Sequence, residues 1–246
     1  MVCPDVSRRA HRGANGGYGA ISVRRLRLPV PTPPDLNVDQ LKFVLDLRRR
    51  GIIDAAVLRA MEEVPRDRFV MPAHVRSAYL DRAMPIACGQ TISQPFVVAY
   101  MTEQLEVAPA HRVLEVGTGS GYQAAILSRL AGRVTTIERY RTLADGARIR
   151  LKALSYDNVD IIAGDGMAGV PDRAPFDRVI VTAAAVTVPQ ALVDQLTVTG
   201  IMVLPLGPHD EHQTLAKIMR TEHGFERTDL IDVRFVPLLP GQAQEL

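Results

Sequence analysis

From residue 112 onward, short apolar runs alternate with longer stretches in which apolar residues recur every three or four positions. Short runs rich in β-branched residues are typical of buried strands, and the longer periodic stretches are typical of helices. The pattern predicts strands at 112–116, 133–138, 158–163, 177–182 and 201–205, and helices at 122–131, 141–154 and 189–196. This alternation favours an α/β fold with a doubly wound, mostly parallel, Rossmann-like sheet.

The part of the chain before this region carries signals for short helices. Asn37 and Asp54 are suitable N-caps, because their side-chain oxygens can accept hydrogen bonds from the first free N–H groups of a helix. We expect one helix between Asn37 and Gly51 and a second that ends before Pro65. The first helix is predicted to bury the face formed by Leu41, Val44 and Leu45.

A third helical region follows these two. Residues 66–69 and 74–79 are predicted as short helical pieces, and residues 88–95 as a loop. Pro95 suits the first position of a helix, because its missing N–H would have no partner there anyway. That helix is predicted to bury Val97, Val98, Met101 and Leu105. At the other end of the chain, Gln213–Met219 and Arg227–Val236 are predicted as antiparallel strands at the sheet edge.

Composition disfavours several classes of protein. No apolar run is long enough to span a membrane, and a net charge of +2 gives no reason to expect nucleic-acid binding. The two cysteines, Cys3 and Cys88, cannot form a disulfide framework, and no cysteine or histidine spacing indicates a metal site. We expect a cytoplasmic protein that binds neither membranes nor nucleic acid and holds no metal. We also expect a monomer.

The strongest chemical signal lies where the first strand of the alternating region ends. The strand at 112–116 leads into the glycine-rich turn at 117–121, and the next strand ends at Glu138. Glycine lets the backbone approach a ligand closely, and a helix behind the turn offers free N–H groups. An acid about 20 residues further on can accept hydrogen bonds from both ribose hydroxyls. The pattern predicts a pocket for a cofactor that contains adenosine.

Two residues of this motif favour one cofactor over another. A dinucleotide site would have its third glycine at the position of Tyr122. Glu115 stands just before the glycines, where its charge would repel a pyrophosphate and attract a cation. S-adenosylmethionine carries a sulfonium and an ammonium group and no phosphate. The sequence therefore favours S-adenosylmethionine, and a nicotinamide oxidoreductase is the alternative that both residues disfavour.

Further motifs extend this signal over most of the chain. They lie at 64–70, 89–95, 115–123, 164–166, 174–177, 181–184 and 234–238. With these motifs, residues 41–239 resemble the bacterial protein-L-isoaspartate O-methyltransferases. The glycine-rich turn is common to methyltransferases, whereas Thr91–Pro95 and Arg234–Leu238 are more specific to this family. The chain departs from the family at Ala185 and Val186, where the family usually has two prolines.

The resemblance implies a class I S-adenosylmethionine-dependent methyltransferase fold with an N-terminal helical appendage. It implies an enzyme that methylates the free α-carboxylate of L-isoaspartyl residues in damaged proteins and peptides. The methyl ester then closes to a succinimide, part of which reopens to normal aspartate. The expected partners are isoaspartyl proteins and peptides. Two alternatives remain, a methyltransferase of the same fold with one dedicated peptide substrate, and a non-catalytic module that binds isoaspartyl protein.

The resemblance also assigns roles to individual residues. Ser93 is the expected catalytic residue, where its hydroxyl and the N–H groups of the following helix could hold the substrate carboxylate. By residue type alone a helix cap is the favoured interpretation of Ser93, which the resemblance reverses, and Asp165 could equally be an ordinary turn aspartate. The expected cofactor-binding residues are Gln90, Thr91, Ile92, Glu115, Gly117, Thr118, Gly119, Gly121, Glu138, Asp165 and Gly166. The expected substrate-binding residues are Ser93, Arg234, Phe235, Val236, Pro237 and Leu238, which would bind an extended peptide through their backbone.

These expectations define the organisation of the chain. Residues 1–35 are rich in arginine and proline and lack amphipathic periodicity, which predicts a disordered tail. Residues 36–246 are predicted to form a single methyltransferase domain. Within it we expect a helical and substrate-loop region at 36–94, a cofactor-binding core at 95–206, and antiparallel strands with the substrate-binding end at 207–246.

Overall fold

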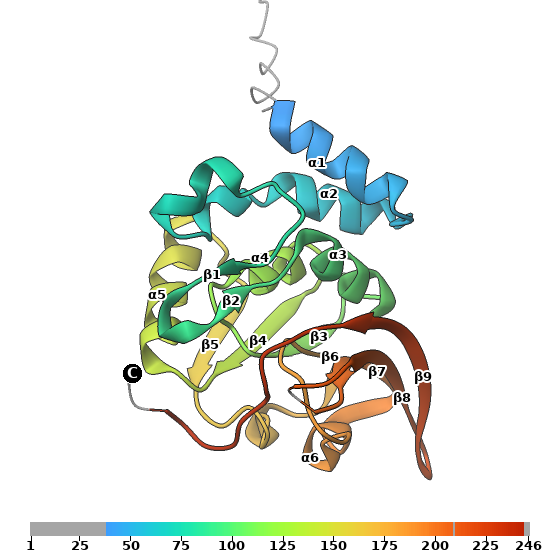
Figure 1. Cartoon of the computed structure of the whole chain (residues 1–246). Coiled ribbons are helices and arrows are strands. Elements are labelled where there is room, and N and C mark those ends of the chain that lie inside the picture. The colour runs from blue at the N-terminus through green and yellow to red at the C-terminus, as the bar shows by residue number, and fades with distance from the viewer. Residues whose placement is uncertain (1–37, 209, 244–246) are drawn as a thin grey trace, which may run out of the picture. The chain divides into compact units, whose positions relative to one another are not determined.

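The computed structural model describes residues 38–208 and 210–243. Its main feature is a seven-stranded sheet with the strand order β5-β4-β3-β6-β7-β8-β9 (Figure 1). The strands are β3 (Arg112–Val116), β4 (Arg133–Glu138), β5 (Val159–Ala163), β6 (Phe176–Val181), β7 (Leu196–Leu206), β8 (Gln213–Thr221) and β9 (Gly224–Val233). The predicted tail at 1–35 and the predicted Asn37 cap lie outside the described residues.

The sheet is parallel from β5 to β7 and antiparallel at β8 and β9. Most of the buried positions of the parallel strands are apolar, as expected for strands that are covered on both faces. The predicted α/β fold with a mostly parallel sheet is therefore confirmed, together with the antiparallel edge.

Helices cover both faces of the sheet. On one face, α3 (Pro95–Gln104) and α4 (Tyr122–Ser128) share a core with Val113, Ile180 and Val203. The helix α5 (Arg141–Ala153) packs against β4 and β5. On the other face, the short helix α6 (Gln190–Val193) packs against a core that includes Leu114, Val179 and Leu204.

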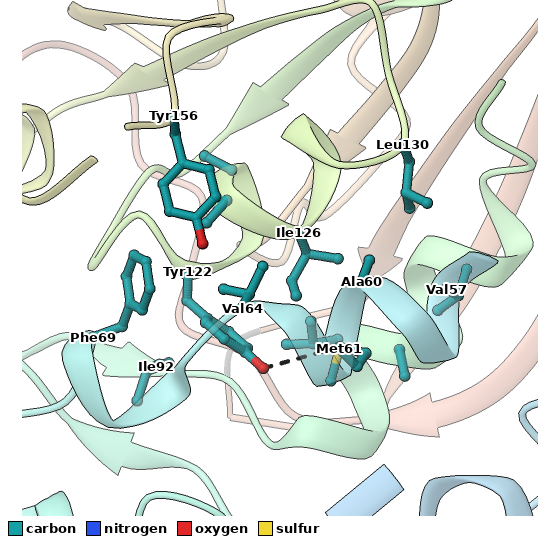
Figure 2. Close-up of a cluster of buried hydrophobic side chains, with 14 of the residues drawn as sticks. Val57, Ala60, Met61, Val64, Phe69, Ile92, Tyr122, Ile126, Leu130 and Tyr156 are labelled. Carbon is teal, nitrogen blue, oxygen red and sulfur yellow. Dashed lines mark hydrogen bonds between the residues drawn. The ribbon is translucent and has the colours of Figure 1, made fainter. Parts of the chain in front are cut away.

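Two further helices form the predicted N-terminal appendage. The helices α1 (Val38–Arg49) and α2 (Ala55–Glu63) share a buried cluster with α4. Figure 2 shows this cluster, in which Met61 of α2 faces Tyr122 at the start of α4. Asp54 caps α2 as predicted, because its Oδ1 accepts hydrogen bonds from the N–H groups of Ala56 (2.7 Å) and Val57 (3.1 Å).

The predicted buried face of α1 was wrong for Leu41 and Leu45, whereas Val44 is partly buried and packs against the core as predicted. Leu41 and Leu45 are each 44% exposed, whereas Phe43 and Leu47 are buried. Phe43 packs edge-on against Tyr79, with ring centroids 5.4 Å apart. The helix has two pairs of apolar residues four positions apart, Leu41 with Leu45 and Phe43 with Leu47. The contact between Phe43 and Tyr79 favours burial of the second pair.

Several boundaries also differ from the prediction. The expected helix at 189–196 is helical only over Gln190–Val193, because the β-branched residues from Thr197 onward continue β7. The expected loop at 88–95 contains β2 (Thr91–Ile92), which pairs with β1 (Met84–Pro85). Short 3₁₀ segments lie at Arg66–Arg68, Pro72–Ser77, Ala87–Gly89 and Pro171–Arg173. No helix in the described part of the chain is long and apolar enough to cross a membrane.

Candidate functional site

A pocket opens at the carboxyl ends of β3, β4 and β6. In an open α/β sheet, ligands bind where the strand order changes direction, and here it changes between β3 and β6. The pocket brings together predicted residues that are far apart in the sequence, namely Gln90, Thr91, Ile92, Ser93, Gly117, Thr118, Gly119, Glu138, Gly166, Val236, Pro237 and Leu238.

Close packing explains the glycines of the turn after β3. Gly117 has φ +99°, and a Cβ there would lie 2.4 Å from Oγ1 of Thr182. Thr182 donates hydrogen bonds to the carbonyls of Val116 (3.1 Å) and Gly117 (2.8 Å). The turn after β3 and the end of β6 are therefore in direct contact, and a larger residue at position 117 would separate them.

Glu138 joins the end of β4 to the same turn. Its carboxylate accepts hydrogen bonds from the N–H of Gly119 (2.9 Å) and the N–H of Tyr140 (3.0 Å), and the residue is buried. Each carboxylate oxygen has a second lone pair, so both can accept further hydrogen bonds from a ligand. The side chain thus holds the turn in place and presents acceptors to the pocket.

Glu115 lies behind the turn rather than in the pocket lining. The residue is fully buried, and neither carboxylate oxygen has a hydrogen-bond partner. Burial raises the pKa of the Glu115 carboxyl to about 8; the Thr136 hydroxyl opposes this rise, and the charge of Glu138 adds to it. The Thr136 hydroxyl lies 2.6 Å from the Thr118 hydroxyl, which is its hydrogen-bond partner. A buried, unpaired carboxyl group beside a pocket favours a cationic ligand.

Two other predicted residues also stand apart from the pocket. Gly121 has φ +87°, and a Cβ there would lie 3.3 Å from Ala147 and Leu151, so this glycine lets α4 approach α5. Asp165 accepts a hydrogen bond from the N–H of Met167 (2.9 Å), which is the turn arrangement that its residue type allowed.

Ser93 lies between β2 and α3 and lines the pocket. The N-cap of α3 is Gln94, whose side chain makes no cap hydrogen bond, so the helix-cap interpretation of Ser93 was wrong. The expected helix N–H groups are also not free: Pro95 has none, and that of Phe96 donates to Asp81 (2.8 Å). Pro95 and Phe96 therefore provide no N–H group that could bind a carboxylate together with the Ser93 hydroxyl.

A second hollow adjoins the first and shares Thr91, Ser93, Thr182 and Val236 with it. Arg234 and Phe235 line this second hollow and not the pocket itself. The two hollows meet at Ser93, which is where a large substrate would have to reach a cofactor. This arrangement separates the expected substrate-binding residues into two groups.

The backbone of this C-terminal segment is largely committed to the fold. The amide of Gln213 bonds both the N–H (2.6 Å) and the carbonyl (3.2 Å) of Phe235. The carbonyl of Val236 and the N–H of Leu238 bond Ala184 at 2.8 and 2.7 Å. These four backbone groups are therefore engaged within the fold, so an extended peptide would have to use the other backbone groups of this segment. Gln213 is a supporting residue that no motif in the sequence singled out.

Ala185, where the family usually has proline, extends the same network. Its N–H donates to the carbonyl of Pro205 (3.0 Å), and its own carbonyl accepts from Gly207 (3.0 Å). Proline has no N–H and could not make the first of these bonds. Val186 is 76% exposed and makes no such link to the sheet.

Other residues line the pocket although the resemblance did not assign them to it, namely Val98, Met101, Ser120, Tyr122, Gln123, Arg139, Tyr140, Thr182, Ala183 and Leu239. Arg139 and Tyr140 follow Glu138 directly, so their place after a strand end was a usable signal. The residues from α3 and α4 gave no such signal, because their position depends on how the helices pack. No group of three potential metal ligands was found among residues 38–208 and 210–243.

Comparison with known proteins identifies the family. The family model for protein-L-isoaspartate(D-aspartate) O-methyltransferase matches residues 39–243. The chain belongs to this family. It is thus an S-adenosylmethionine-dependent protein carboxyl methyltransferase, which confirms the expected enzyme class and cofactor.

Individual relatives agree with this assignment. Protein-L-isoaspartate O-methyltransferases from Rhodopseudomonas palustris (strain BisB18) and Bradyrhizobium sp. (strain BTAi1) are each 59% identical to this chain. The matches cover 89% and 87% of the chain and 100% of both relatives.

Two solved structures support the fold. One is a protein-L-isoaspartate O-methyltransferase at 26% identity and a TM-score of 0.73, with 80% of this chain and 65% of that chain covered. The other, from Plasmodium falciparum, is assigned to the same enzyme class and is in complex with S-adenosyl-L-homocysteine. It shares 28% identity and a TM-score of 0.72, with 82% of this chain and 99% of that chain covered.

The burial of Glu115 predicts a pH dependence of stability in the cofactor-free protein. With a pKa of about 8, the folded protein keeps a proton on Glu115 that the unfolded chain loses above its normal pKa, near 4.3. Stability should therefore fall as the pH rises from about 4.5 to 8. Glu115→Gln should remove this pH-dependent component. The free energy of unfolding of the variant, taken relative to that of the wild type, should therefore rise by about 2–4 kcal/mol between pH 5 and pH 8. Urea denaturation at both pH values measures this difference, and parallel pH profiles for the two proteins would contradict it.

Proposed function

We propose that the residues around this pocket carry out the reaction of the family. In that reaction a methyl group passes from S-adenosylmethionine to the free α-carboxylate of an L-isoaspartyl residue in a damaged protein or peptide. The observation that supports this best is the pair of buried acids, Glu115 and Glu138, at neighbouring strand ends. Two acids suit a cofactor with a sulfonium and an ammonium group and no phosphate.

The residues present fit this cofactor. The carboxylate of Glu138 would accept hydrogen bonds from the ribose hydroxyls. The narrow turn formed by Gly117, Thr118 and Gly119 would lie against the methionine part, with the Glu115 carboxyl behind it, whose ionised form the positive charges of the cofactor would favour. Gly166 lines the pocket and would face the adenine. A Cβ at this position would lie 2.6 Å from Val116, so the packing leaves no room for a side chain. Asp165 would support this face through its turn and offer an acceptor to the adenine amino group.

Residues outside the β3 turn would complete the cofactor site. Gln90, Thr91 and Ile92 would line the path between the methyl group and its acceptor. Gly121 would act indirectly, by setting the start of α4. Arg139 and Tyr140 line the pocket next to Glu138, with the guanidinium 5.2 Å from the ring centroid, and would border the nucleoside.

The reaction depends mainly on how the methyl donor and the acceptor carboxylate are positioned. When bound, S-adenosylmethionine supplies a reactive methyl group on sulfur. The acceptor carboxylate is ionised at neutral pH, so no strong general base is needed. Ser93 would donate its hydroxyl hydrogen to one carboxylate oxygen and leave the other to bond the methyl carbon as the carbon–sulfur bond breaks. Ile92, Val98 and Met101 would keep water away from the reacting atoms.

The second hollow would hold the flanking part of the substrate. Arg234, Phe235 and Val236 line it, while Pro237 and Leu238 continue into the cofactor pocket. With much of their backbone committed, these residues would act through their side chains and shape. We further propose that the enzyme works as a monomer in the cytoplasm on isoaspartyl proteins and peptides, without nucleic acid or membrane partners. The near-neutral charge of +2 supports the absence of nucleic-acid partners, and size-exclusion chromatography tests the monomer.

The proposed reaction is tested directly with a pair of peptides that differ only in one linkage. The protein should transfer labelled methyl groups to the isoaspartyl peptide and not to its normal aspartyl twin. Product analysis should then show a succinimide and some normal aspartyl peptide. Equal labelling of both peptides, or no labelling of either by folded protein, would contradict the repair function. The second result would favour a dedicated substrate or a non-catalytic role.

Glu138→Ala should mainly weaken cofactor binding. The substitution removes the two proposed hydrogen bonds from the ribose hydroxyls to a charged acceptor, and it also leaves the N–H of Gly119 without its acceptor. The expected loss of cofactor-binding free energy is about 2–4 kcal/mol. Calorimetry with S-adenosyl-L-homocysteine measures this directly. Asp160→Ala is a matched control, because it removes an acid from the start of the neighbouring strand β5. Equal affinities of the Glu138 variant and the wild type would place the ribose elsewhere.

Ser93→Ala should slow methyl transfer and leave cofactor affinity unchanged. Loss of one charge-assisted hydrogen bond should lower kcat/KM by about ten- to a hundred-fold. The structure gives Ser93 no cap hydrogen bond to lose, so the melting temperature should stay close to that of the wild type. Wild-type kinetics in this variant would contradict the proposed role of Ser93 but would leave the proposed reaction unaffected.

A further inference from the structure

Arg66 is a fully buried arginine for which the reaction above gives no role. It begins the 3₁₀ segment Arg66–Arg68 and is 0% exposed. No carboxylate pairs with it: its Nε donates to the carbonyl of Ala78 (2.9 Å) and one terminal nitrogen donates to the carbonyl of Ser93 (2.7 Å). The other terminal nitrogen is buried and has no hydrogen-bond partner. Burying a charge without a countercharge costs several kcal/mol, so the arrangement needs an explanation.

The hydrogen bond to Ser93 is placed where the fold gives little other support. Ser93 follows a strand of only two residues and precedes the proline that begins α3. Holding its carbonyl fixes the peptide plane between Ser93 and Gln94, and so restrains the backbone position from which the Ser93 side chain projects. On the far side of this peptide, Asp81 accepts hydrogen bonds from the N–H of Phe96 and the amide of Gln94, both at 2.8 Å.

The same guanidinium also touches the cofactor side of the pocket. Its central carbon lies 4.8 Å from the ring centroid of Tyr122, a distance typical of a cation–π contact. Tyr122 follows the glycine-rich turn directly and lines the pocket. Phe69 packs edge-on against the same ring with centroids 5.5 Å apart, and Figure 2 shows Phe69 and Tyr122 in one buried cluster. Tyr122 is thus fixed from several sides, and Arg66 connects it to Ser93.

We propose that Arg66 is a positioning residue for methyl transfer, which holds Ser93 at a set place relative to the cofactor turn through the Ser93 carbonyl and the Tyr122 ring. The planar guanidinium suits this role, because it can donate in two directions and lie against an aromatic ring at once. Lysine could not reproduce all three contacts. The inference rests on the proposed role of Ser93.

Arg66→Met tests the proposal, because it keeps an unbranched side chain and removes the charge and the donors. The expected result is a fall in kcat for the isoaspartyl peptide of about ten- to a hundred-fold, with less than a threefold change in affinity for S-adenosyl-L-homocysteine. Leu192→Ala is the control for lost stability, since Leu192 is fully buried in the core on the other face of the sheet. At a temperature where both variants are folded, it should keep near wild-type kcat.

A double-mutant cycle separates positioning from general stabilisation. If Arg66 acts through Ser93, Arg66→Met should cost less than about threefold further in kcat when Ser93 is already alanine. Ethylguanidinium added to Arg66→Ala should restore kcat by at least tenfold. If Arg66→Met does not fold, the same cycle is run with Arg66→Lys, which keeps the charge and loses the fork.

Two results would overturn the proposal. One is wild-type kcat in a folded Arg66 variant, and the other is an equal loss of kcat with and without the Ser93 hydroxyl. Neither result affects the proposed reaction, which depends on whether the wild-type protein methylates the isoaspartyl peptide. If Ser93→Ala alone has wild-type kinetics, the role of Ser93 fails and this inference fails with it.

Discussion

The handedness of the crossover connections decides where this site can lie. A strand, a helix and a parallel strand connect in the right-handed sense almost without exception. The path from β3 through α4 to β4 and through α5 to β5 therefore keeps both helices on one face, while β6 returns to the other side of β3. The ends of β3, β4 and β6 must then meet with nothing between them. The glycine turn, Glu138 and Thr182 share one pocket for this reason.

Two buried polar side chains lie on either side of this meeting point. Glu115 has no hydrogen-bond partner for its carboxylate, and Arg66 has no acid for its guanidinium. Either group would cost less free energy if it were replaced by an apolar residue of similar volume. Arg66 contacts Ser93 and Tyr122, which line the pocket. Glu115 lies two residues before Gly117, which also lines it. Free energy of folding is thus given up close to the site itself.

The sequence predicted those parts of the molecule that depend on local pattern. The strands β3 and β4 have the predicted bounds, because continuous apolar runs between turns leave few other choices. The glycine turn and Glu138 were found by spacing alone. The buried face of α1 was missed because Phe43 is selected by Tyr79, which is far away in the sequence.

The supporting residues were missed for the same physical reason. Gln213 bonds Phe235 across two strands, and Arg66 bonds Ser93 across a whole helix and a hairpin. Neither contact leaves a periodic trace in the sequence. The roles of the individual site residues remain predictions, although the geometry now shows which of them can act together.

The hydrogen bond between Ala185 and Pro205 has a consequence for which residues position 185 tolerates. The family usually carries proline at position 185, and proline would leave the Pro205 carbonyl without its donor. Because Ala185 and Pro205 are both buried, that unpaired carbonyl would cost about 1–3 kcal/mol. A proline at position 185 would therefore require a compensating change around the Pro205 carbonyl. The residue that this position tolerates depends on its partner across the sheet, even though it alters no group that takes part in the proposed reaction.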